Sequence, residues 1–416
     1  MPLTLDTYKQ DTCRYCDGHL PEPFLELGTM PLANSFLTES QLKDEEFVCP
    51  LSLTFCPSCY LVQLSHVVPP DLMFKHYLYV SSTTKTFHEH FGQYAEEVRG
   101  KLSSVESPLA VDIGSNDGLL VNSYQKQGMR ALGVDPADNL AEEANKKGIT
   151  TLNRYFDADA VNEIKSKWGK AHAVSGNNVF AHIHDVQSVC QNVSELLEDD
   201  GFFVIEFPYL MVMLDDLVFD MIYHEHLSYI SISALQHLYS RFNLEVFDVK
   251  QVASHGGSLR VYAQKKKGPY SREAIVDDLV QKEKERGCLA KETFETFAGQ
   301  VNQIKQDLLA FVNKAKAEGK SVAGYGAPAK AGTIINFCEF NETQIDYIVD
   351  DNPLKQYHFS PGARIPIVPS SHLENNVPDY LIIFAWNFAK EIIAKIEPLR
   401  EKGVQFIIPL PKPEVI

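Results

Sequence analysis

The stretch VDIGSNDG, residues 111–118, decides the fold of the central part of this chain. The compact apolar run that it ends reads as a buried strand, and the residues after it read as the start of a helix. Gly114 and Gly118 permit a tight turn and a close approach of the backbone to a ligand. A glycine loop between a strand and a helix is where α/β sheets bind nucleotides. The stretch therefore predicts a nucleotide-type site at the edge of a mostly parallel sheet.

Acidic residues in and near this loop indicate which ligand it binds. The loop lacks the G-x-G-x-x-G pattern that fits a pyrophosphate, and it contains Asp112 and Asp117. Carboxylates repel a pyrophosphate but suit the ammonium and sulfonium groups of S-adenosylmethionine. Asp135 ends the next predicted strand, close to the spacing of about 20 residues at which an acid binds ribose hydroxyls. We expect the cofactor to contact the loop and two later strand ends, at Gly114, Ser115, Asn116, Asp135, Pro136, Asn177 and Asn178.

Two Cys-x-x-Cys pairs precede this unit, Cys13/Cys16 and Cys56/Cys59. Each pair turns tightly enough for both sulfurs to face one point, so the four thiolates can meet at one tetrahedral Zn²⁺. The gap of about forty residues between the pairs is longer than the common gap of about 15–20. We expect a closed, structural zinc site, because so small a segment has little core of its own. The alternative is a set of unpaired buried thiols; Cys49 is a spare candidate that we assign to the core.

The composition limits the classes of function. A hydrophobic content of 44% with 22% charged residues is typical of a soluble globular protein, and 416 residues are enough for two or three domains. The net charge of −17 would repel phosphate backbones, which argues against a nucleic-acid partner. No apolar run approaches membrane-spanning length, so we expect no membrane partner. The scattered cysteines fit a reducing compartment, and we expect the cytoplasm. The sequence leaves the oligomeric state open.

Strands and helices alternate from about residue 76 to residue 267, which predicts a doubly wound sheet. Residues 270–319 are charged and read as a helical pair, and the alternation resumes at SVAGYGA, residues 321–327. We therefore expect an α/β protein of three parts. These are a small zinc-binding module over residues 1–75, a central Rossmann-like domain over 76–267, and a helical linker with a second Rossmann-like domain over 268–416.

Histidines and tyrosines cluster after predicted strand ends. His182 and His184 lie in NVFAHIHD, and YHEH occupies residues 223–226. The carboxyl ends of strands are where α/β sheets place ligands, and His and Tyr near a carboxylate are what a general base requires. Two alternatives stay open at this point. The histidines could be exposed loop residues without a role, or all four could bind a metal, although no H-E-x-x-H helix is present.

Two further turns are candidates for a phosphate site. GYGAPAKAGT, residues 324–333, places Gly326 and Lys330 at a strand-to-helix turn, where backbone N–H groups and a lysine suit phosphates. HGGSLRV, residues 255–261, enters a strand with Arg260 as either a phosphate partner or a surface charge. The alternative for the first turn is a plain structural turn.

Taken together, these stretches resemble a family of three-domain sugar 3-C-methyltransferases that act on nucleotide-linked keto-sugars. The resemblance covers nearly the whole chain. It depends on the loop and turns above and on CPSCYLVQL, HYLYVSSTTKTFHEHF, GNNVFAHI and YHEHLSYIS. The resemblance implies a zinc-binding N-terminal domain, a central methyltransferase domain that binds S-adenosylmethionine, and a C-terminal Rossmann-like domain that helps to hold the sugar nucleotide.

The resemblance also implies a reaction: carbon methylation next to a ketone. A 4-keto group makes the C-3 hydrogen acidic, so a positioned base can form an enolate that attacks the sulfonium methyl. By resemblance, His226 is the base and Glu225 orients it, while Tyr223, Tyr77 and His182 bind the sugar and stabilise the enolate oxygen.

The chain departs from the family in the last domain. Ala331 and Gly332 follow Lys330 where family members often have Gly and Asn, and Asp351 and the bulky pair at 357–358 stand where Arg and Gly are expected. These differences leave the base and the sugar of the substrate open. Two other functions remain as alternatives: a nicotinamide-dependent nucleotide-sugar oxidoreductase that uses the GYG turn, and a non-catalytic scaffold that binds a partner through the zinc module.

Overall fold

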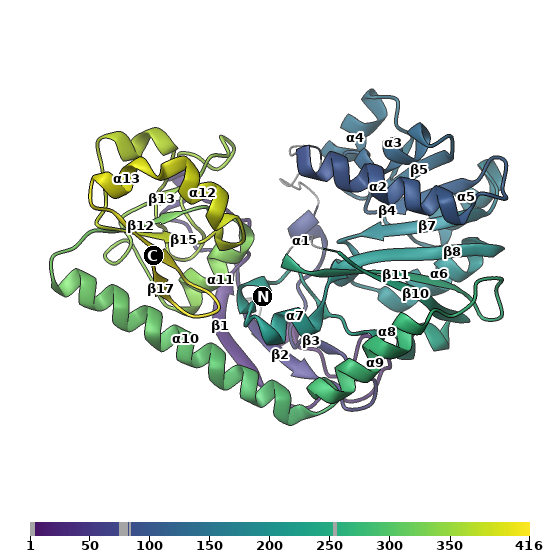
Figure 1. Ribbon diagram of the computed structural model, residues 1–416, viewed down its shortest axis with the longest axis horizontal. Coiled ribbons are helices and arrows are strands. Elements are labelled where there is room, and N and C mark those ends of the chain that lie inside the picture. The colour runs from purple at the N-terminus through teal and green to yellow at the C-terminus, as the bar shows by residue number, and fades with distance from the viewer. Residues whose placement is uncertain (1–4, 75–81, 83–84, 253–255) are drawn as a thin grey trace.

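The computed structural model describes residues 5–74, 82, 85–252 and 256–416, which form three sheets (Figure 1). Tyr77, predicted to bind the sugar, lies outside the described residues. No helix in the described ranges has both the length and the apolar character needed to cross a membrane.

The N-terminal module is built on a four-stranded antiparallel sheet of order β1-β2-β3-β9. Three strands come from the module itself, β1 (Leu25–Pro31), β2 (Val48–Phe55) and β3 (Val62–Leu64). The fourth, β9 (Ser228–Tyr229), comes from the central domain and pairs with β3. The short helices of this part are η1 (Leu5–Tyr8), η2 (Glu39–Gln41) and α1 (Asp71–Phe74). The module therefore shares its sheet with the residues that directly follow YHEH.

The central sheet has seven strands in the order β10-β11-β8-β7-β4-β5-β6. The five strands from β8 to β6 are parallel, and β11 and β10 are antiparallel additions at the other side. The strands are β4 (Leu109–Ile113), β5 (Arg130–Asp135), β6 (Thr151–Asn153), β7 (Ala171–Asn177), β8 (Leu197–Pro208), β10 (Leu244–Val252) and β11 (Ser258–Lys265). The predicted doubly wound sheet is confirmed.

Alternation of side chains along the strands gives this sheet two cores. Phe202 packs with one core and its neighbour Phe203 with the other, because successive side chains in a strand point to opposite faces. The helices that cover the faces are α2 (Lys85–Lys101), α3 (Leu119–Lys126), α4 (Asp138–Lys146), α5 (Ala158–Lys167), α6 (Val186–Leu196) and α8 (Ile232–Arg241). Shorter pieces lie near the carboxyl ends of the strands: η4 (Phe180–His182), α7 (Leu210–Asp215) and η5 (Phe219–Met221).

Two helices lead from the central domain to the last one. They are α9 (Ala274–Arg286) and α10 (Lys291–Ala317), and the 27-residue α10 runs along one side of the molecule under both the N-terminal strands and the C-terminal lobe (Figure 1). Apolar residues of α10, of the N-terminal sheet and of the C-terminal domain form a single core cluster. The predicted boundaries at 75/76 and 267/268 fall between β3 and α2 and between β11 and α9, and they stay predictions.

The C-terminal domain has a six-stranded sheet of order β14-β13-β12-β15-β16-β17, parallel except for β17. Its strands are β12 (Val322–Tyr325), β13 (Ile348–Val349), β14 (Ile367–Val368), β15 (Tyr380–Ile383), β16 (Gln405–Ile408) and β17 (Glu414–Val415). Its helices are α11 (Ala329–Phe337), η7 (Ser370–Glu374), η8 (Trp386–Phe388), α12 (Ala389–Ile396) and α13 (Pro398–Glu401). The second α/β unit predicted from SVAGYGA is confirmed.

Candidate active site

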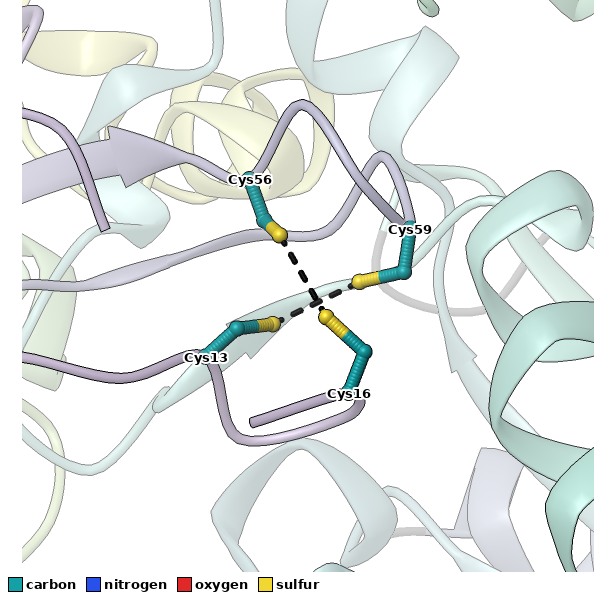
Figure 2. A group of neighbouring side chains, drawn as sticks. All are labelled: Cys13, Cys16, Cys56 and Cys59. Atoms are coloured by element: carbon teal, nitrogen blue, oxygen red, sulfur yellow. Dashed lines mark hydrogen bonds between the residues drawn. The ribbon is translucent and has the colours of Figure 1, made fainter. Parts of the chain in front are cut away.

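Four cysteine side chains from two loops of the N-terminal module converge on one point (Figure 2). Their sulfurs lie within 4.8 Å of one another, and the Cys13–Cys59 and Cys16–Cys56 sulfur pairs are 3.4 and 3.6 Å apart. Four sulfurs at about 2.3 Å from a tetrahedral Zn²⁺ stand about 3.8 Å from one another, so this donor set fits zinc. Three of the four cysteines are buried, which agrees with a closed structural site.

The two cysteine pairs sit in turns with the same hydrogen bonding. The N–H of Asp17 donates to the carbonyl of Cys13 at 2.9 Å, and the N–H of Tyr60 donates to the carbonyl of Cys56 at 2.9 Å. Asp17 and Tyr60 both adopt left-handed backbone conformations, with φ of 61° and 65°. Each turn thereby directs both of its sulfurs to one side, as the spacing predicted.

No second metal centre forms among the residues that the structure describes. The four cysteines are the one group of His, Cys, Asp and Glu there with metal-ligand spacing, so the four-histidine alternative is not realised. Cys49 lies apart, fully buried in a small apolar cluster with Leu32 and Val68. Burial raises the pKa of the Cys49 thiol to about 12, as expected for a core residue.

The glycine loop leaves the end of β4, whose neighbours in the sheet are β5 and β7. Gly114 has a φ of 65°, and a side-chain carbon there would lie 2.6 Å from Val179. Asn116 is left-handed as well, with φ of 52°, and its N–H donates to the carboxylate of Asp135 at 2.7 Å. This hydrogen bond to Asp135 therefore holds the loop that follows β4 against the end of β5.

Two buried carboxyl groups make this edge of the sheet acidic. Burial raises the pKa of Asp135 to about 6, although hydrogen bonds from the N–H groups of Ala137 and Asn116 act in the opposite direction. Asp112, inside β4, accepts a hydrogen bond from the Ser175 hydroxyl at 2.6 Å, and burial raises the pKa of Asp112 to about 7. A nearby positive charge stabilises the ionised form of such groups, so the edge favours a ligand with cationic parts.

All seven predicted cofactor residues lie at this edge, at or just after the ends of β4, β5 and β7. The Nδ2 of Asn177 and the Oδ1 of Asn178 are buried and have no hydrogen-bond partner among the described residues, so they fit a polar ligand. The hydroxyl of Ser115 is likewise buried without a hydrogen-bond partner among the described residues, and it packs against β5, where a side-chain carbon on Gly133 would collide with it. The contacts of these residues with a cofactor stay predictions.

His226 and Tyr223 form a hydrogen-bonded pair after η5. The Tyr223 hydroxyl and the Nε2 of His226 are 2.8 Å apart, and the two ring centroids are 4.0 Å apart. The Nδ1 of His226 lies 2.8 Å from the carbonyl oxygen of Met221. A carbonyl oxygen only accepts, so Nδ1 carries the proton and Nε2 carries a lone pair directed at the tyrosine hydroxyl. The ring of His182 is close by, with its centroid 4.9 Å from that of His226.

The two other residues of YHEH connect this pair to the N-terminal module. Glu225 is buried and accepts a hydrogen bond from the side-chain amide of Asn34 at 2.5 Å. The Nε2 of His224 donates to the carbonyl of Cys49 at 3.1 Å, and burial lowers the pKa of His224 to about 4. The orientation of His226 by Glu225 stays a prediction; the ring of His226 is hydrogen-bonded to Tyr223 and to the carbonyl of Met221.

A small cavity of about 80 Å³ lies beside His226. Its lining includes Tyr209 and Gly257 of the central domain and Tyr229 of β9. Trp386 of η8, in the C-terminal domain, also lines it. Ligand sites are common at such junctions between domains.

Comparison with known proteins identifies the family. Three family models match: a zinc binding domain over residues 13–74, a methyltransferase domain over 88–249, and a C-methyltransferase C-terminal domain over 253–411. The C-methyltransferase NovU from Streptomyces niveus is 36% identical over 409 residues, which are 98% of this chain and 97% of NovU. The chain belongs to this C-methyltransferase family.

Two further proteins are similar to part of the chain. The ubiquinone biosynthesis O-methyltransferase of Methylococcus capsulatus is 28% identical over 103 residues, which are 24% of this chain and 43% of that protein. The magnesium protoporphyrin IX methyltransferase of Synechocystis aligns at 12% identity and a TM-score of 0.32, over 43% of this chain and 81% of that one. The whole-chain match and the family models show an S-adenosylmethionine-dependent C-methyltransferase with a zinc-binding domain.

The structure of the C-methyltransferase contradicts the prediction for Arg260. Its side chain on β11 is 2% exposed, so it is not a surface charge. The guanidinium donates to Glu206 at 2.9 and 3.0 Å and to Glu97 at 2.6 Å, and it lies 3.9 Å from the centroid of the Tyr94 ring. Two carboxylates already neutralise this arginine, which joins α2 to the sheet and does not present a charge to a phosphate.

The predicted phosphate site at the GYG turn is also not supported. Gly326 has a φ of 87°, as a tight turn requires. The N–H of Ala327, two residues before α11, donates to the carboxylate of Asp350 at 2.7 Å. An acid at this position repels a phosphate, and the same repulsion weakens the nicotinamide alternative. Gly326 therefore fits the alternative, a structural turn without a ligand.

Lys330 extends away from this turn toward the central domain. Its Nζ lies 3.8 Å from the carboxylate of Asp220 and 4.4 Å from the centroid of the Trp386 ring. Burial lowers the pKa of Lys330, and the nearby Asp220 opposes that shift. The lysine predicted to bind substrate is thus part of an internal contact between the two domains.

Four residues of this region were not predicted: Asn34, Asp220, Met221 and Trp386. Asp220 had a signal in the sequence, because it is the one charged residue in the apolar run LVFDMI at 217–222. Met221 had none, since it acts through its backbone carbonyl.

Proposed function

We propose that this C-methyltransferase methylates C-3 of a nucleotide-linked 4-keto-deoxysugar through an enolate. The observation that carries the proposal is the chain of two hydrogen bonds from Tyr223 through His226 to Met221, next to a cavity at the domain junction. Proton abstraction next to a carbonyl requires a base with a lone pair, and a neutral His226 in this chain of hydrogen bonds provides one at Nε2. A hydrogen-bonded base also argues for catalysis and against a passive scaffold.

The proton moves as follows in the proposed reaction. The C-3–H bond breaks, the proton ends on Nε2 of His226 directly or through the Tyr223 hydroxyl, and the electron pair moves into the enolate. The Nδ1–H bond to Met221 stabilises the imidazolium that forms. S-adenosylmethionine, when bound, would supply the methyl group to C-3, with S-adenosylhomocysteine as the leaving group. His182, beside His226, and Tyr77 complete the proposed sugar site. None of the eight cysteines forms a disulfide, which supports a cytoplasmic location for this protein.

The test separates proton abstraction from methyl transfer. With S-adenosylhomocysteine bound and a nucleoside-diphosphate 4-keto-deoxysugar in D₂O, we expect the wild type to exchange the C-3 hydrogen, measured by NMR. His226→Asn should slow both this exchange and methylation by about 10²–10⁴-fold, the usual contribution of a general base. His237→Asn, at an exposed position on α8, is the matched control and should exchange at the wild-type rate.

Two results would contradict the proposal. Wild-type turnover in His226→Asn would remove this residue as the base. Calorimetric binding of NAD in place of S-adenosylhomocysteine would favour an oxidoreductase.

A further inference from the structure

The C-terminal domain contacts the segment that carries His226 at three points. We call residues 219–229 the catalytic segment. The indole N–H of Trp386 donates to the carboxylate of Asp220 at 2.6 Å, and the Nζ of Lys330 lies 3.8 Å from the same oxygen. The hydroxyl of Thr333, on α11, donates to the carbonyl of Ile222 at 2.7 Å. The contacts therefore fall on the residues immediately before and after Met221.

The Asp220 contact is made in the interior. Asp220 and Thr333 are 0% and 1% exposed, and burial raises the pKa of Asp220 while Lys330 and Trp386 oppose that shift. A buried ion pair seldom adds net stability compared with an apolar pair, because desolvation of the charges offsets their attraction. A role in fixing one conformation explains its presence better than a role in stability.

Met221, between these contacts, is hydrogen-bonded to the ring of His226. Its carbonyl oxygen accepts the Nδ1–H of His226 at 2.8 Å. The hydrogen bond at one ring nitrogen sets which tautomer is present, and here it leaves the lone pair on Nε2. A shift of the Met221 carbonyl by about 1 Å would break this hydrogen bond, since such bonds weaken beyond about 3.2 Å.

We propose that Lys330, Thr333 and Trp386 are positioning residues for His226. They hold the backbone on both sides of the Met221 carbonyl and so keep His226 as the Nδ1–H tautomer. The C-terminal domain thereby takes part in the reaction from outside the methyltransferase sheet. The link to catalysis depends on the proposed function, whereas the tautomer is a property of the protein alone.

The matched pair Thr333→Val and Thr54→Val tests this proposal. Both changes remove a hydroxyl at a position that is 1% exposed, and both remove one hydrogen bond to a backbone carbonyl, to Ile222 at 2.7 Å and to Pro21 at 2.8 Å. The two variants therefore differ in location and not in chemistry. Trp386→Phe is the second test variant, because it keeps an aromatic ring near Lys330 while it removes the indole N–H together with part of the indole ring.

The main readout is the ¹⁵N NMR spectrum of the histidine side chains in the full-length protein, with the signals of His226 assigned by their loss in His226→Asn. We expect a single Nδ1–H tautomer in the wild type and in Thr54→Val, and a mixture of tautomers in Thr333→Val and Trp386→Phe. In these two variants kcat should fall by about tenfold, equivalent to about 1.4 kcal/mol, with KM for both substrates within about twofold of the wild type.

Three outcomes would contradict the positioning proposal or the proposed function. Unchanged tautomers in both Thr333→Val and Trp386→Phe overturn the proposal, even if kcat falls. Equal changes in Thr54→Val would show a general loss of stability and overturn it as well. If the tautomer shifts as expected but His226→Asn keeps wild-type turnover, the positioning of His226 stands and the proposed function fails.

Discussion

The N-terminal module and the C-terminal domain hold the catalytic segment from two sides and by different means. On the N-terminal side the contact combines backbone pairing with the side chains of His224 and Glu225: β9 joins β3, and the N–H of Leu64 donates to the carbonyl of Leu227 at 3.2 Å. On the C-terminal side it consists of three side chains from α11 and η8. Backbone pairing can be lost only with the sheet, whereas each side-chain contact can be removed alone.

This difference ties the N-terminal contact to the metal. The first cysteine turn also reaches the segment after His182, because the guanidinium of Arg14 donates to the carbonyl of His184 at 2.8 Å and to that of Ile183. The zinc module thus contacts both histidine-bearing segments. We therefore expect loss of zinc to disrupt the site as a whole and loss of a C-terminal contact to change only the state of His226.

We expect the largest effect when a zinc ligand is removed, because the N-terminal contact with the catalytic segment depends on the fold of the zinc module. Cys56→Ala leaves three thiolates, and zinc binding in small structural sites contributes about 10–16 kcal/mol to folding. We expect zinc content to fall from about one per chain to none. We expect trypsin to cut within the module and turnover to be lost, while calorimetry still detects S-adenosylhomocysteine at the central sheet.

Cys49→Ala is the control for this experiment, because Cys49 is equally buried and lies outside the cysteine set. It should keep zinc and turnover. A Cys56→Ala protein with an intact, protease-resistant module would show that the fold of the module does not depend on zinc.

Some features of the fold and of the candidate site could be predicted from the sequence, and others could not. The cysteine set and the loop at Gly114 follow from local spacing, so residue types at fixed intervals were enough to predict them. The partners of Arg260 and Lys330 could not be predicted, because Glu206 and Asp220 are distant in the sequence and only the fold brings them together. Local sequence patterns identify residues that lie in the same turn, but not charged groups that the fold brings together from distant parts of the sequence.

A second, smaller effect should appear on acidification, because the N-terminal contact includes His224. Its pKa is about 4 in the folded protein and about 6.5 when unfolded, so the unfolded state takes up a proton first. The stability that this depressed pKa provides is complete above pH about 6.5 and is lost as the pH falls toward 4. The loss approaches about 3 kcal/mol, since each unit of pKa is worth about 1.4 kcal/mol.

Urea unfolding at pH 7 and pH 4.5 measures this effect. His224→Gln keeps a donor for the carbonyl of Cys49 and cannot titrate, so its stability should depend less on pH in this range. His88→Gln, at an exposed position on α2, should behave as the wild type. An identical pH dependence in all three proteins would assign the acid sensitivity to other groups.

The smallest effect is expected where the two flanking parts contact each other directly and not through the catalytic segment. Arg364 of the C-terminal domain lies 3.2 Å from the carboxylate of Glu46 and donates to the carbonyls of Leu42 and Asp44 at 2.5 and 3.0 Å. Its side chain is 39% exposed, and surface ion pairs of this kind contribute about 1 kcal/mol or less. Arg364→Met should therefore lower the free energy of unfolding by about 1 kcal/mol at most and leave the tautomer of His226 unchanged. A tautomer shift in this variant, measured by the same ¹⁵N spectra, would mean that the general fit of the C-terminal domain sets the state of His226, and the three contacts around Met221 would lose their special role.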